Sequence, residues 1–71
     1  MGVAEDLGDA LAKDTIEAAE KLGDQELIRE VARELAATSS TSEEAFMTSV
    51  RVRLAERRAR KYLESRLKNA E

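Results

Sequence analysis

The stretch SEEAFMTSVRVRLAERRARKYLESRLK, residues 42–68, decides the fold of this chain. It contains neither Gly nor Pro, the two residues that most often interrupt a helix. At about 1.5 Å per residue, a helix over this stretch would extend about 40 Å. We therefore expect one long helix, longer than the helices that the preceding part of the chain can place against it.

Two shorter helices are predicted before it, over residues 4–22 and 25–37. Gly23 and Asp24 separate them. Gly accepts the left-handed conformation that ends a helix, and the Asp carboxylate accepts hydrogen bonds from the free N–H groups that begin the next one. Since Ala, Leu, Glu, Lys and Arg dominate and Pro is absent, the composition is typical of an all-α protein. The predicted fold is one domain over residues 1–71, a short helical hairpin plus one long third helix, forming a three-helix bundle.

The first helix is expected to bury an apolar stripe whose members recur every three or four positions. These members are Val3, Leu7, Leu11, Ala18 and Leu22, with Thr15 in the gap. Gly8 lies inside the same helix and is expected to weaken it by about 0.5–1 kcal/mol relative to Ala.

The segment TSSTS, residues 38–42, separates the second helix from the third. Its hydroxyl groups compete for backbone hydrogen bonds, which favours the end of a helix. Thr41 has Glu44 three residues downstream, the spacing of an N-terminal capping box. We expect the third helix to begin at this cap, close to residue 42.

The chain lacks the usual supports of small domains. A folded chain near 71 residues buries only about 60% of the surface that it exposes when unfolded. Cys and His are both absent, which removes disulfides and the common zinc sites, and we expect no metal and no cofactor. The absence of Cys, of an apolar run near 20 residues and of a signal-peptide pattern favours a cytoplasmic location.

The apolar pattern changes phase along the third helix. Its first stripe consists of Phe46, Met47, Val50 and Leu54, and is expected to pack on the hairpin. A second stripe, called the seam, consists of Val52, Ala55, Ala59, Leu63 and Leu67. At 100° per residue the two stripes lie on different faces. We predict a homodimer in which the third helices cross at the seam; the alternative is a monomer with one gently curving core that takes both stripes.

Charge is divided unevenly along the chain. Residues 1–37 carry four basic and ten acidic side chains, a net −6, whereas residues 38–71 carry eight basic and five acidic ones, a net +3. Five cations lie on one side of the predicted third helix and are called the basic ridge: Arg53, Arg57, Arg60, Lys61 and Lys68. With Tyr62 as an anchor, the ridge is predicted to bind an acidic protein surface. The alternative is that these side chains are solvated or paired with acids such as Glu56 and Glu64.

The residue types present disfavour catalysis. Without His or Cys the chain lacks the commonest general bases and nucleophiles, and its three glycines are too scattered for a phosphate-binding loop. We expect no catalytic residues and no enzyme. The predicted function is that of a small protein-binding or regulatory protein, of the inhibitor, adaptor or antitoxin type.

Nucleic-acid binding through the basic ridge is the alternative function, because a row of cations offers salt-dependent phosphate contacts. The net charge of −3, the presence of only one Phe and one Tyr, and the lack of a helix-turn-helix pattern count against it. Binding to a membrane surface is disfavoured further, since the distal half has no Trp or Phe to insert and carries Glu56 and Glu64.

Overall fold

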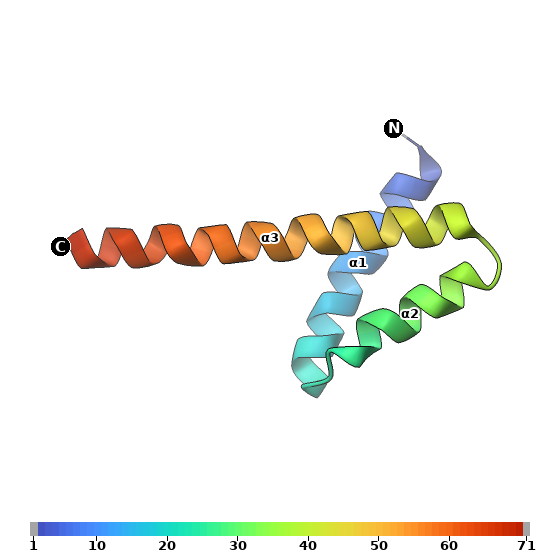
Figure 1. Ribbon diagram of the computed structural model, residues 1–71, viewed down its shortest axis with the longest axis horizontal. Helices are drawn as coiled ribbons and strands as arrows, with labels where there is room; N and C mark the ends of the chain where they lie inside the picture. The colour runs from blue at the N-terminus through green and yellow to red at the C-terminus, as the bar shows by residue number, and fades with distance from the viewer. Residues whose placement is uncertain (1, 71) are drawn as a thin grey trace.

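The computed structural model describes residues 2–70, which form three α-helices and no strand (Figure 1). Helix α1 spans Val3–Leu22, α2 spans Glu26–Ala36 and α3 spans Ser40–Ala70. α1 and α3 cross in contact, and α2 runs from the far end of α1 back to the start of α3. The all-α prediction with three helices is confirmed, and each helix boundary lies within two residues of the predicted one.

The turn between α1 and α2 has the predicted chemistry. Gly23 adopts the left-handed conformation with φ 65°. Its N–H donates to the Glu20 carbonyl at 3.2 Å and the Asp24 N–H donates to the Ala19 carbonyl at 2.9 Å, the paired bonds of a Schellman motif. The Asp24 carboxylate then accepts the N–H of Glu26 at 3.0 Å, which satisfies a free donor at the start of α2.

The start of α3 differs from the prediction. Ser39 Oγ accepts the backbone N–H of Ser42 at 3.1 Å, so Ser39 is the capping residue. Thr41 lies inside the first turn of α3, and the predicted cap at Thr41 was wrong. All five residues of the segment 38–42 are Ser or Thr, so each has a hydroxyl group that could cap the helix. Ser39 takes this role, and α3 therefore begins two residues earlier than predicted.

The core lies where the three helices meet. Its buried members are Ala12, Ile16 and Ala19 of α1, Ile28 and Ala32 of α2, and Phe46 and Val50 of α3. Alanine supplies three of these seven, and Phe46 is the largest fully buried side chain. The small alanine side chains let the helices pack close together. Because each alanine removes little apolar surface from water, the core contributes only a small hydrophobic stabilisation.

Helix α1 buries a different face from the predicted one. Its buried residues are Gly8, Ala12, Thr15, Ile16 and Ala19. Val3, Leu7 and Leu22 of the predicted stripe are exposed instead. The prediction was right for Thr15, which is buried, and in part for Leu11, which packs half-buried against the core, and it was wrong for Val3, Leu7 and Leu22. Spacing alone does not choose between two stripes on an Ala-rich helix, and the smaller residues permit the closer approach to α3.

Gly8 lies where the backbones of α1 and α3 come close together. A Cβ at this position would lie 3.0 Å from the backbone N of Phe46 and 3.1 Å from the carbonyl C of Ala45. The helix propensity that Gly8 lacks is therefore offset by the packing that it permits.

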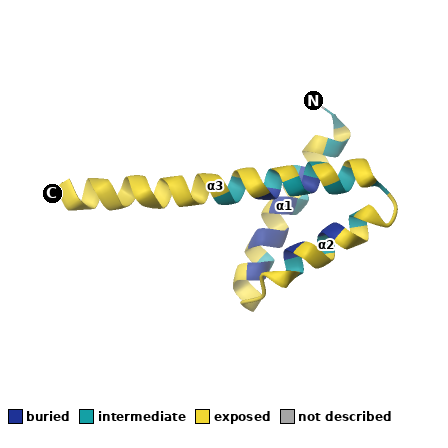
Figure 2. Ribbon diagram, in the orientation of Figure 1, coloured by how far each residue is buried: buried dark blue, intermediate teal, exposed yellow. Residues whose placement is uncertain are grey.

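Helix α3 is longer than the body on which it packs. Phe46 and Val50 are buried and Met47 and Leu54 partly so, as predicted, whereas every residue in 55–70 is exposed (Figure 2). These 16 residues, called the distal arm, extend about 24 Å. The molecule is consequently elongated, with a longest extent of 51 Å and a radius of gyration of 14.5 Å, against about 11 Å for a compact domain of this length.

Candidate partner-binding surface

The seam is uncovered in the single chain. All five of its residues are exposed, including Leu63 at 54% and Leu67 at 61%. The alternative of one curving core that takes both stripes is therefore wrong, because α1 and α2 end before they reach the second stripe. Within the described chain nothing covers the seam, so it contacts either water or another molecule.

The exposed area of the chain is larger than its mass predicts. The accessible surface is 5603 Å². A compact monomer of 7.9 kDa exposes about 4,400 Å² by the usual scaling with mass. The excess, about 1,200 Å², is comparable to the roughly 800 Å² that each partner contributes to a standard protein interface.

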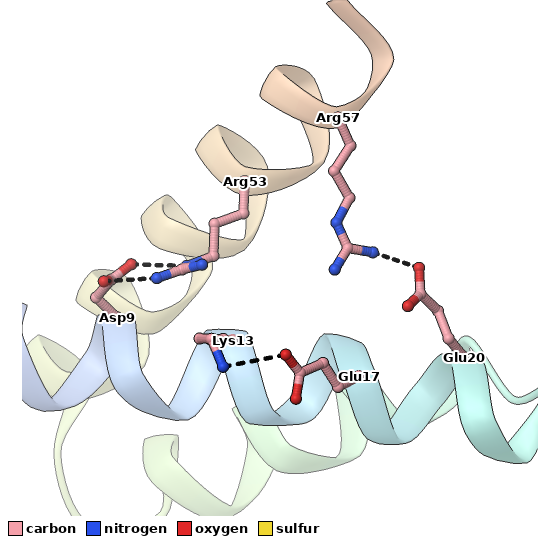
Figure 3. Close-up of polar contacts among 6 residues, drawn as sticks. All are labelled: Asp9, Lys13, Glu17, Glu20, Arg53 and Arg57. Atoms are coloured by element: carbon pink, nitrogen blue, oxygen red, sulfur yellow. Dashed lines mark hydrogen bonds and ion pairs between the residues drawn. The ribbon is translucent and has the colours of Figure 1, made fainter. Parts of the chain in front are cut away.

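The first residue of the basic ridge binds a carboxylate of its own chain. Arg53 donates from Nε to Asp9 Oδ1 at 2.9 Å and from Nη2 to Oδ2 at 2.8 Å, a two-pronged pair between α3 and α1 (Figure 3). The Arg53 guanidinium lowers the pKa of the Asp9 carboxyl through this hydrogen bond, and Asp9 raises the pKa of Arg53. Both side chains are partly open to solvent.

Arg57, one turn further along α3, pairs with Glu20 near the other end of α1 (Figure 3). Both ion pairs join α3 to α1 on the C-terminal side of the place where α3 packs against Gly8. Beyond Arg57 the helices diverge and enclose an open corner of about 340 Å³, lined largely by Arg57, Arg58, Lys61 and Glu20. Part of the charge asymmetry is thus met within the protein, but through Asp9 and Glu20 of α1 and not through the local acids Glu56 and Glu64 that the alternative named for these arginines.

The remaining predicted contact residues lie on the distal arm. Arg60 donates to Glu56 one turn earlier, at 2.8 Å from Nε, and this bond raises the pKa of Arg60. The Tyr62 hydroxyl accepts from Arg66 Nη1 at 3.2 Å. Within residues 2–70, neither Lys61 nor Lys68 forms an ion pair. Of the six predicted contact residues, Arg53 and Arg57 therefore pair with carboxylates of α1, and the other four, all on the distal arm, form no ion pair or hydrogen bond with α1 in the described chain. Their binding of a partner stays a prediction.

Sequence reasoning missed a second exposed apolar surface at the opposite end of the molecule. A notch of about 290 Å³ lies between the three helices, lined mainly by Val3, Leu7 and Leu11 of α1, Leu35 of α2 and Ser42 of α3. It exists because α2 has only 11 residues and does not cover the first turns of α1. The signal in the sequence was the length difference between the first two helices.

No protein-family model matches the chain, and no similar protein was found among curated proteins or solved structures. Across residues 2–70, His, Cys, Asp and Glu form no group of three or more placed to hold a metal ion. None of the helices described combines the length and apolarity required to cross a membrane. The candidate surface rests on the geometry of the distal arm and the notch.

Proposed function

We propose that this chain is a small non-catalytic protein-binding protein of regulatory type, which recognises its partners through the distal arm and assembles as a homodimer through the seam. The observation that carries the proposal is the arm itself: 16 consecutive helical residues, all exposed, with an apolar stripe on one side and cations on another. A cytoplasmic location, supported by the absence of Cys, belongs to the same proposal.

The physical reason is that an unpacked helical arm has little stability of its own. A helix of about 12–15 residues without packing is marginal in water, and most helical stability in proteins comes from burying an apolar face. Leu63 and Leu67, four residues apart, present such a face. Their burial by a second protein surface would stabilise the arm and supply binding free energy together.

The cations of the arm define the chemistry of the target. Lys61 and Lys68 form no ion pair within the described chain, and Arg58 lines the open corner beside α1. An acidic protein surface would complement these three side chains. Cations at the edge of an interface act chiefly on association rate and on the choice of partner, so specificity toward acidic targets is expected to depend on salt.

The test is capture of partners from a cell extract on the immobilised chain, followed by mass spectrometry. Lys61→Glu with Lys68→Glu should remove the captured acidic proteins, because both changes reverse charge on the arm. Lys13→Glu with Lys21→Glu is the matched control, since it makes the same change of net charge on α1 and leaves the arm intact.

An identical set of captured proteins for the wild type and for the arm variant would contradict the proposal. Binding to random-sequence duplex DNA that weakens steeply with salt, and that the arm variant loses, would replace it with nucleic-acid binding. Light scattering tests the dimer separately, because a dimer has twice the 7.9 kDa mass of the chain.

A further inference from the structure

The two uncovered apolar surfaces of the molecule carry opposite charge. The distal arm, residues 55–70, has six basic and two acidic side chains, a net +4. The notch is lined by apolar and small residues, Val3, Ala4, Leu7, Gly8, Leu11, Leu35 and Ser42. Five carboxylates and no cation lie directly next to these residues in the sequence, at Glu5, Asp6, Asp9, Glu34 and Glu43, and of these Asp9 is paired with Arg53. An apolar stripe among cations and an apolar notch whose lining residues have acidic neighbours in the sequence are thus present on the same chain.

We infer that the distal arm of one chain docks in the notch of a second copy, whose arm returns the same contact, so that the dimer closes with two-fold symmetry. The inference rests on the proposed self-association and specifies which surface of the second copy covers the seam. It differs from a direct crossing of the two third helices, seam against seam.

Electrostatics favours the notch over the second seam. Seam against seam would bring two arms of charge +4 together, well within the screening length of about 8 Å in physiological salt. Like charges facing each other across an interface are costly, and opposite charges both attract and orient the partners. The notch of the second copy offers exposed apolar side chains in segments of opposite charge.

The size and lining of the notch suit aliphatic side chains. Its volume of about 290 Å³ lies just below the range of about 300–1,000 Å³ typical of small-molecule pockets. Val3, Leu7 and Leu35 supply its apolar walls. Leu63 and Leu67 of the arm, four residues apart on one helical face, offer a matching pair of side chains.

The dimensions of the chain allow both contacts at once. The arm accounts for about 24 Å of the 51 Å long axis and leaves about 27 Å for the body. The arm and the notch lie at opposite ends of this axis, since α3 starts beside the notch and ends at the tip of the arm (Figure 1). Two copies side by side in opposite directions therefore place each arm beside the body of the other.

The test compares dimerisation of full-length variants by sedimentation velocity over a range of concentrations. Leu7→Lys places a cation in the notch, facing the basic arm, and Leu67→Asp places a carboxylate on the arm, facing the notch and its acidic neighbours. Each should raise the dimer dissociation constant at least about a hundredfold, because a charge is taken out of water beside like charges. Leu22→Lys is the matched control, since Leu22 is exposed on the same helix to 69%, compared with 66% for Leu7, and lies outside the notch.

The expected result is a dimer for the wild type and for Leu22→Lys, and a monomer of unchanged helix content for Leu7→Lys and for Leu67→Asp. An equimolar mixture of these last two should recover a weaker dimer, since one arm and one notch remain intact in the mixed pair. Recovery by mixing also shows that both variants are folded.

Dimerisation of Leu7→Lys at wild-type strength, together with its loss in Leu67→Asp, would overturn docking in the notch while the proposed self-association through the arm stands. A wild type that stays monomeric at every concentration would overturn both. A mass that grows beyond two chains would overturn the reciprocal closure.

The salt dependence of dimerisation provides an independent test of the inference. Raising the salt concentration from about 0.05 M to about 0.5 M screens charges. It should weaken the wild-type dimer if the arm meets the notch and its acidic neighbours. A dimer that tightens with salt would indicate repulsion between two arms and would overturn the inference.

Discussion

The two halves of α3 have opposite surroundings although they belong to one uninterrupted helix. In the proximal half, Phe46 and Val50 are buried against α1 and α2, whereas in the distal arm Leu63 and Leu67 stand in water. The distal leucines are no less hydrophobic than the proximal residues. Burial in this chain is therefore set by how far α1 and α2 reach, and the comparison teaches that apolar spacing identifies a face without identifying what covers it.

The largest difference between the halves should appear on truncation of their apolar side chains. Phe46→Ala leaves a cavity at the crossing of the helices and should cost about 3–5 kcal/mol. A domain of this size has only about 4–11 kcal/mol of stability, so this variant should be largely unfolded at modest temperature. Leu63→Ala should change the free energy of unfolding of the monomer by less than about 0.5 kcal/mol.

Urea denaturation at low protein concentration measures both variants. Equal losses for Phe46→Ala and Leu63→Ala would break the comparison, because they would mean that the distal arm is packed within its own chain.

A smaller effect is expected at the crossing of α1 and α3. Gly8→Ala improves helix propensity by about 1 kcal/mol but places a Cβ 3.0 Å from the backbone of Phe46. Overpacking against backbone costs about 1–3 kcal/mol, so a net loss of about 1 kcal/mol is expected in thermal unfolding. Ala10→Gly, at an exposed position of the same helix, is the control that measures propensity alone. A stabilised Gly8→Ala would contradict the close approach.

The ion pair that braces the two helices should give a weaker, pH-dependent effect. Arg53 lowers the pKa of Asp9 below its usual value of 3.8, so the contribution to stability is fully present above that pH and is lost as the pH falls through the lower pKa of the folded state. Arg53→Gln should be less stable than the wild type at pH 7, and the difference should vanish in acid. Acid titrations followed by circular dichroism compare the two, and a difference that persists at the lowest pH would exclude the ion pair as its cause.

The smallest effect on stability is expected from removal of residues 58–70, most of the distal arm. A chain that ends at Arg57 keeps both ion pairs to α1 and every buried residue. Its melting temperature at low concentration should match that of the full chain, while its self-association should be lost. A large drop in melting temperature would show that residues 58–70 contribute to the fold of the monomer.

The sequence was sufficient for the number and bounds of the helices because their signals are local. Gly23 with Asp24 determines the first turn, and the uninterrupted run after residue 42 determines the long helix. It was not sufficient for the buried face of α1, since Val3 and Leu7 are more hydrophobic than Gly8 and Ala12, and the choice depends on how closely α3 approaches. From helix propensity we expected Gly8 to weaken its helix, whereas in the structure its missing side chain lets α1 pack closely against α3.

For the candidate surface, the seam could be predicted because its spacing differs in phase from the core stripe. The pairing of the first two ridge arginines could not be predicted, because the partners of Arg53 and Arg57 are Asp9 and Glu20, more than thirty residues away in the sequence. The notch was not predicted either: the lengths of the first two helices indicated that part of α1 would stay uncovered, but the notch itself depends on how three helix ends meet.

Amide hydrogen exchange along α3, measured at concentrations well below and well above the dimer dissociation constant, tests the difference between the two halves most directly. Residues 46–54 should be protected at both concentrations, because their own chain buries them. Residues 55–70 should exchange rapidly in the dilute sample and slowly in the concentrated one, since only a second copy covers them. Equal exchange of the arm at both concentrations would contradict the proposal that a second copy covers the distal arm.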